Sequence, residues 1–156
     1  GRDLKIINFG SHAMNSMRME KGYRGWGAEL TTEISVVEAG LDRFFNLDKK
    51  NEFVGSKAIS EKLNNGIKIK LVYLEIEADR ADALGNEPIY YENERVGLTT
   101  SGAYGFRVNK SLAFAYVNSD LTKNDTEFLI DIQGKKAKAK IIEEPAFDPK
   151  NLRLKS

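Results

Sequence analysis

The strongest constraint on the fold is a change in the spacing of apolar residues at Gly66. Before this glycine, apolar residues recur three and four positions apart between loops, as in helices. After it they recur at every second position, beginning with IKIK at residues 67–70, which is typical of a half-buried strand. The chain therefore predicts an α+β fold, with a short helical part in residues 1–66 and an antiparallel β part in residues 67–156.

Two helices are expected in the first part. One begins at the N-cap Ser11, runs to about Glu20 and ends at Gly22. Its apolar face is formed by Ala13, Met14 and Met17. Ser56 is the expected N-cap of the second helix, residues 57–65.

The second part consists of short segments with strand composition, separated by tight turns. The expected strands are residues 67–77, 88–91, 96–100, 112–117, 126–133 and 136–142. The polar residues 92–95 and Gly134 mark two hairpins. Strands at this spacing favour a small antiparallel barrel or sandwich. Residues 143–156 have no periodicity and contain two prolines, which indicates a tail packed along the surface.

The composition excludes several classes of function. A net charge of +1 gives no support to a nucleic-acid or membrane partner. With no cysteine and one histidine, His12, the chain has no iron–sulfur, thiolate-zinc or multi-histidine site, and a Ser-His-Asp triad would depend on His12. No apolar run reaches the ~18 residues of a membrane span. The chain starts without methionine or a signal peptide, which suggests a piece of a longer, reducing-compartment protein.

The segment RMEKGYRGWGAELTTEISVVEAGL, residues 18–41, has the composition of a ligand-contacting loop. Arg18 lies near the end of the first helix, where its guanidinium can fork onto a carboxylate or a planar polar ring of a ligand. It can equally pair with Glu20 or a nearby acid of the chain, and both interpretations stay open. Tyr23 and Trp26 can stack on a planar ligand, although packing in a core or an interface is the more common role of such residues.

Other candidate features have a plainer interpretation. The glycines of residues 22–27 lack the preceding strand and following helix of a dinucleotide-binding fingerprint. The lysine-rich segment 135–142 is interpreted as an edge or surface strand protected from pairing, rather than as a phosphate-binding patch. The small residues of 99–106 suit either a close approach of a ligand or domain, or a barrel corner. Three acids are interpreted as surface or structural groups: Glu29, Glu33 and Glu38.

The order of these motifs resembles the glycine cleavage T-protein family, and most closely the folate-domain ends of dimethylglycine and sarcosine dehydrogenases. The family pattern arginine-leucine-glutamate-alanine-glycine is similar to Arg-Met-Glu-Lys-Gly at residues 18–22. Trp26-Gly27 stands for the family's tyrosine-glycine, and residues 36–41 for its proline-valine-glutamate-x-x-leucine run. Residues 84–117 and 143–156 resemble the C-terminal barrel and its ending.

The resemblance implies that residues 1–66 end a central folate-binding domain and that residues 67–156 form a C-terminal β-barrel. It implies transfer of a one-carbon unit from a small amine to tetrahydrofolate. Arg18 carries over as a folate contact and Trp26 as the aromatic position, as cofactor-binding residues. The family's catalytic aspartate falls upstream, so no catalytic residue is expected in this chain, and the chain alone is expected to be inactive.

The same resemblance sets expectations about partners. FAD is expected only in an upstream domain of the same polypeptide, and a lipoyl-carrier protein is a further candidate partner. The expected compartment is the cytoplasm, or the mitochondrial matrix in a eukaryote. Two alternatives stay open: a non-catalytic interaction or regulatory module of the same family, and a barrel that binds oligonucleotides, which the neutral charge and scattered aromatics disfavour.

Overall fold

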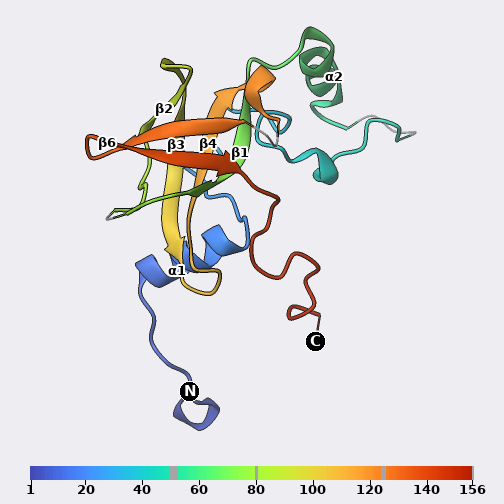
Figure 1. The fold of residues 1–156 in the computed structure, drawn as a ribbon. Helices are drawn as coiled ribbons and strands as arrows, with labels where there is room; N and C mark the ends of the chain where they lie inside the picture. The colour runs from blue at the N-terminus through green and yellow to red at the C-terminus, as the bar shows by residue number, and fades with distance from the viewer. Residues whose placement is uncertain (50–52, 80, 124–125, 156) are drawn as a thin grey trace.

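A computed structural model describes residues 1–49, 53–79, 81–123 and 126–155. Its centre is a closed six-stranded antiparallel β-barrel, flanked by two α-helices and long loops (Figure 1). This confirms the expected α+β fold with a small barrel. None of the helices in the described ranges has the length and apolar character needed to cross a membrane.

The six barrel strands all lie in the second part of the chain. They are β1 (Ile69–Ile76), β2 (Pro88–Tyr91), β3 (Glu94–Gly105), β4 (Lys110–Asn118), β5 (Glu127–Ile132) and β6 (Lys135–Ile141). Their order around the barrel is β1-β4-β3-β2-β5-β6, and β6 closes the barrel by pairing with β1. The helices are α1 (Ser11–Glu20) and α2 (Ser56–Asn65), with short 3-10 turns η1 (Arg2–Leu4), η2 (Asp42–Phe44) and η3 (Ser119–Leu121).

Both predicted hairpins are present and have the same kind of turn. Glu92 and Asn93 connect β2 to β3 with φ of 49° and 69°, and Gln133 and Gly134 connect β5 to β6 with φ of 53° and 80°. Two consecutive left-handed residues make a turn whose twist matches that of paired strands. Asparagine and glycine adopt this conformation readily, so the local sequence sets the register of each hairpin.

Strand β3 is longer than the expected 96–100 and includes most of the small-residue segment 99–106. Its pairing with β4 shifts register between Thr99 and Ser101, which places a β-bulge at Thr100. At Gly102 an added Cβ would lie 2.3 Å from the Ala83 carbonyl oxygen, so only glycine fits there. The segment thus permits close approach of other parts of the chain, and the bulge within it is consistent with the barrel-corner interpretation.

The barrel has a core inside and a second core on part of its outer wall. The interior is filled by alternate residues of most strands, including Leu74, Ala115 and Phe128. Tyr73 and Phe114 point outward into the second core, beneath α1 and the C-terminal tail. The expected half-buried pattern is therefore wrong for residues 71–74, which are buried on both faces because α1 and the tail cover that wall.

Helix α1 lies across the lower end of the barrel in Figure 1, and its buried face differs from the expected one. The predicted face of Ala13, Met14 and Met17 is exposed. The face against the barrel carries Ser16, Met19 and Glu20. Polar contacts orient the helix: the Ser16 hydroxyl donates to the Tyr104 carbonyl at 2.6 Å, and the Tyr73 hydroxyl donates to the Met19 carbonyl at 2.6 Å. Apolar spacing alone did not reveal this face because hydrogen bonds determine it.

The predicted N-caps are each displaced by one residue. Ser11 and Ser56 are the first residues of α1 and α2, and the N-caps are Gly10 and Gly55, which have no capping side chain. Strand β6 pairs with both β5 and β1, so it is not an edge strand, although its lysines do face solvent as a surface strand predicts. Residues 143–155 form turns against the outside of the molecule, and Ser156 lies outside the described residues.

Candidate functional site

Arg18 lies in the last turn of α1 and is held by contacts within the chain. Its Nε donates to Asn15 Oδ1 at 2.8 Å, and its Nη1 donates to Glu29 Oε2 at 2.8 Å and to the Tyr23 carbonyl at 3.2 Å. The intramolecular pair that the sequence left open therefore forms, with Glu29 and not with Glu20.

Glu29 is the centre of this arrangement, and its side chain is fully buried, with 0% exposure. Its Oε2 accepts from Arg18 and from the Gly25 amide at 2.7 Å. Its Oε1 accepts from the Thr100 hydroxyl at 2.7 Å and from the Ser101 hydroxyl. Four donors thus surround one carboxylate, and we call Asn15, Arg18, Glu29, Thr100 and Ser101 the Arg18–Glu29 cluster.

The environment of Glu29 keeps its carboxyl group ionised. Burial raises the pKa of this carboxyl, but the hydrogen bonds from Ser101, Gly25 and Thr100, with the Arg18 charge, lower it by more. The net pKa lies below its ordinary value. The interpretation of Glu29 as a surface acid is wrong, while a structural role is confirmed. Its hydroxyl partners are 71 and 72 residues away in the sequence, so no local spacing could reveal them.

The guanidinium of Arg18 is fixed along one edge and open at the other. Nε and Nη1 are used by Asn15, Glu29 and Tyr23. Among the described residues, Nη2 has no hydrogen-bond acceptor, and the side chain is 19% exposed. Since every guanidinium nitrogen can donate, Nη2 is available to a carboxylate or carbonyl oxygen of a ligand.

Two aromatic side chains project from the loop that carries Glu29. Trp26 is 76% exposed and Tyr23 is 51% exposed, so packing in the core of this chain is wrong for both, while an interface role stays a prediction. The loop itself is ordered around Trp26: the next residue, Gly27, donates its amide to the Leu30 carbonyl at 2.8 Å. The preceding residue is Gly25, whose amide holds Glu29. An open indole therefore stands on the backbone that supports the Arg18–Glu29 cluster.

The remaining acids of this region have structural roles or face solvent. Glu38 accepts from the Ser35 hydroxyl at 2.6 Å and pairs with Lys62 at 2.9 Å, so a structural role is confirmed. Glu33 is exposed. Across the described ranges, no three or more histidine, aspartate or glutamate side chains gather where they could hold a metal ion.

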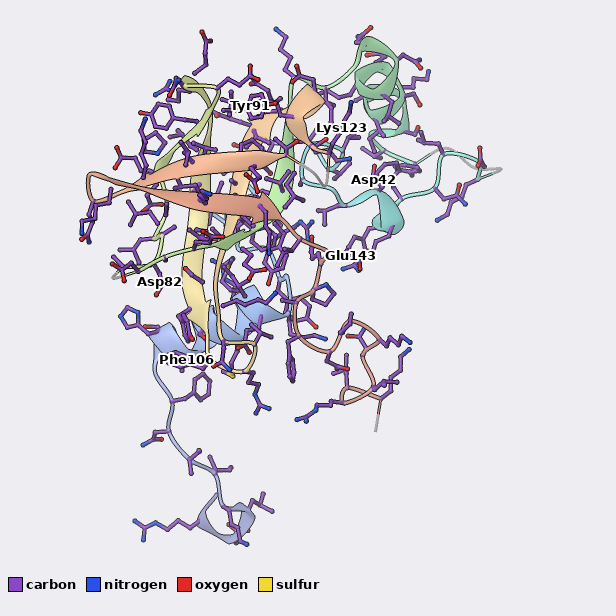
Figure 2. All side chains as sticks on the ribbon, viewed as in Figure 1. Asp42, Asp82, Tyr91, Phe106, Lys123 and Glu143 are labelled. Atoms are coloured by element: carbon purple, nitrogen blue, oxygen red, sulfur yellow. The ribbon has the colours of Figure 1, made fainter. Side chains whose placement is uncertain are left out.

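A separate cleft of about 510 Å³ lies between the loop after α1 and the C-terminal tail. Arg24 crosses from loop to tail: its Nη1 and Nη2 donate to the two Glu144 oxygens at 2.5 and 3.1 Å. Lys21 also reaches the tail: it donates to the Asp148 carbonyl at 3.0 Å and forms an ion pair with Asp148 Oδ2 at 3.6 Å. Figure 2 shows Asp42, which also lines this cleft, on the same side of the molecule as Glu143 at the start of the tail. Ion pairs therefore fasten the tail beside the loop.

Two family models match this chain. The glycine cleavage T-protein C-terminal barrel domain matches residues 70–148, and the GCVT N-terminal domain matches residues 1–49. The chain belongs to the glycine cleavage T-protein family. The expected domain boundary at Gly66, between a folate-binding part (residues 1–66) and a barrel domain (residues 67–156), stays a prediction.

Similar individual proteins are consistent with this family assignment. The chain is 39% identical over 156 residues to the mitochondrial dimethylglycine dehydrogenase of Rattus norvegicus, covering 99% of this chain and 18% of that protein. It is 36% identical over 149 residues to the aminomethyltransferase of Acidobacterium capsulatum, covering 94% and 39%. The crystal structure of the glycine cleavage system aminomethyltransferase T from Bartonella henselae superposes with a TM-score of 0.80 at 25% identity, covering 88% and 38%. The chain thus spans well under half the length of these relatives.

Proposed function

We propose that this chain is the C-terminal portion of a tetrahydrofolate-dependent protein of aminomethyltransferase type, which transfers a one-carbon unit from an amine to tetrahydrofolate. In this proposal Arg18 and Trp26 contact the folate. The observation that carries it is the state of Arg18, whose guanidinium is fixed through Nε and Nη1 while Nη2 stays open. Family membership supports the general kind of activity.

The open groups fit the chemistry of a folate. A folate combines planar rings with carbonyl groups and glutamate carboxylates. Nη2 of Arg18 can donate to either oxygen type, and the exposed indole of Trp26 offers a face for stacking. Tryptophan lacks the hydroxyl of the family's tyrosine, so a hydrogen bond from that hydroxyl is not part of the proposal, and the proposed contribution of Trp26 is stacking.

The chemical step is assigned to the part of the protein that precedes this chain in its relatives. Glu29 is a poor general base, because four donors surround it and its pKa is lowered. No catalytic residue is assigned here, and the isolated chain is expected to be inactive.

Similarity to dimethylglycine dehydrogenase supports a more specific form of the proposal. The whole protein would be an FAD-linked amine dehydrogenase, with the flavin held by an upstream domain and an N-methyl amine as substrate. A mitochondrial matrix location would follow in a eukaryote, and a cytoplasmic one elsewhere. A lipoyl-carrier partner belongs to the transferase form instead.

The test uses the complete protein that contains this chain. Titration calorimetry with tetrahydrofolate should show that Arg18→Ala weakens binding by about 2–4 kcal/mol, because a desolvated charged hydrogen bond is lost. Arg95→Ala is the matched control, since Arg95 is an exposed arginine on the β2–β3 hairpin.

Three results separate the alternatives. Unchanged folate affinity in Arg18→Ala overturns the assignment of the site. Folate binding without turnover of an aminomethyl or N-methyl amine donor points to the non-catalytic module. Turnover by the isolated chain contradicts the expected upstream location of the catalytic group.

A further inference from the structure

The contacts of Glu29 with the barrel depend on an irregularity of β3. Thr100 and Ser101 are consecutive residues, and consecutive side chains of a regular strand point to opposite faces. Both hydroxyls nevertheless donate to the same oxygen, Oε1 of Glu29. The bulge between Thr99 and Ser101 makes this possible, because the extra residue breaks the alternation.

The main chain of Glu29 is tied to the barrel as well. The Tyr116 hydroxyl, from β4, donates to the Glu29 carbonyl at 2.7 Å. The loop residue therefore has its backbone fixed by β4 and its side chain fixed by β3. Neither contact involves α1, so the barrel holds Glu29 at two points that are independent of the helix that carries Arg18.

The ion pair between Arg18 and Glu29 is end-on and consists of one hydrogen bond. Glu29 meets Arg18 through Nη1 alone, and Asn15 takes Nε. A pair that served only to neutralise a buried acid would be expected to use both nitrogens in a fork, which is the stronger arrangement. The end-on contact holds the plane of the guanidinium and leaves Nη2 open.

We propose that Glu29 is a positioning residue for folate binding, and that the hydroxyls of Thr100 and Ser101 act through it to aim the Arg18 guanidinium. This inference rests on the proposed function, in which Arg18 contacts the folate. It makes a bulged strand of the C-terminal barrel part of the folate site without any contact between that strand and the ligand.

The experiment uses the complete protein with the double variant Thr100→Val/Ser101→Ala, which removes the two hydroxyls and keeps the Glu29–Arg18 pair. Tetrahydrofolate affinity should fall roughly tenfold, the size of coupling expected within one hydrogen-bonded network. Combined with Arg18→Ala, the hydroxyl changes should cause little further loss, since there is no guanidinium left to aim. Thr100→Val alone serves if the double variant does not fold.

Thr99→Val is the matched control. Thr99 is a buried neighbour in the same strand, and its hydroxyl donates to Glu87 instead of Glu29. This variant should lower the thermal unfolding midpoint, as Ser101→Ala should, while leaving folate affinity unchanged. The control separates an effect on stability from an effect on the orientation of the Arg18 guanidinium.

The outcomes distinguish the two proposals. If Arg18→Ala weakens folate binding but Thr100→Val/Ser101→Ala does not, the positioning role is overturned and the proposed function stands. If the hydroxyl variant and Arg18→Ala have fully additive effects, the positioning role is also overturned. If Arg18→Ala leaves the affinity unchanged, both proposals fail.

Discussion

At the scale of single residues, the molecule keeps one carboxylate out of water by giving each of its oxygens two donors. The cost of burying the Glu29 charge is offset only while all four donors are present. Removing the charge therefore affects more than one ion pair. It also removes the acceptor that holds α1, the glycine-rich loop and β3 together at a single point.

The first prediction concerns the pH dependence of stability in Glu29→Gln. The folded-state pKa of Glu29 is lowered, so its contribution is present above the unfolded-state pKa and is lost as pH falls through the folded value. At pH 7 the variant should be less stable by about 1–3 kcal/mol. Urea unfolding at several pH values should show that the difference in free energy of unfolding shrinks below pH 4.5, which is the ordinary pKa of a glutamate carboxyl.

Glu33→Gln is the control for that measurement, because Glu33 is an exposed acid of the same loop. It should change the free energy of unfolding by less than about 0.5 kcal/mol. A Glu29→Gln deficit that stays constant as the pH falls would contradict the ionised, donor-held state of Glu29.

How far the site could be predicted depends on whether a residue's partners are local. Arg18 was identifiable because its position beside a glycine-rich turn is visible in the sequence. Glu29 was not, because Thr100 and Ser101 lie far along the chain and a bulge has no reliable local signature. The sequence indicates Trp26 as a candidate, but the exposure of its side chain follows only from the fold.

At the scale of elements, the local sequence determines the hairpin turns, whereas packing against distant residues determines the length of the strands and their buried faces. The hairpins at Asn93 and Gly134 could be read from the sequence since their turn residues are the ones that left-handed backbone favours. The length of β3 could not be predicted, because its small residues have the composition of a turn, whereas in the fold they allow close contacts within a strand. The buried face of α1 was also hidden, because Ser16 and Glu20 use polar contacts.

The second prediction tests close packing at β3. Gly102→Ala would place a Cβ 2.3 Å from the Ala83 carbonyl oxygen, so the chain must shift and stability should fall by about 1–3 kcal/mol. Gly10→Ala is the comparison, because no atom lies within 4 Å of an added Cβ there. Its loss should stay below about 1 kcal/mol, the usual effect at an N-cap. Equal thermal midpoints of the two variants would contradict this packing.

The third prediction concerns the attachment of the tail. Arg24→Ala removes the bidentate pair with Glu144 and the 2.7 Å bond to the Ala39 carbonyl. Hydrogen exchange of residues 143–155 should become faster in this variant, while amides of the barrel strands keep their protection. Arg43→Ala is the control, since Arg43 is an exposed arginine that stacks on Phe44. Unchanged exchange in the tail would show that Arg24 does not fasten it.

At the scale of the whole molecule, the six described strands close into a barrel, and its outer wall is apolar where α1 and the tail cover it. Tyr73, Phe114 and Met19 share the second core, so residues 1–66 and 67–156 are joined by buried contacts. The exposed face of α1, with Met14 and Met17, is not part of this shared core.

The fourth prediction follows from the shared core. A chain of residues 67–156 alone keeps the tail but lacks α1, so it would expose part of the surface of Leu71, Tyr73 and Phe114 on the outside of β1 and β4. It should bind a hydrophobic dye and unfold at a lower temperature than the 156-residue chain. Equal midpoints and no dye binding would show that the barrel is stable without its covering.

The single extra residue at the β3 bulge has a consequence for comparing members of this family. Deleting one residue between Gly97 and Gly102 would bring the strand back into phase and turn one of the two hydroxyls to the other side of the sheet. The acid of the glycine-rich loop would then keep one alcohol donor instead of two. A relative with a one-residue gap at this point is therefore expected to hold such an acid through one strand hydroxyl, and the gap would be recognised by counting residues, without a structure.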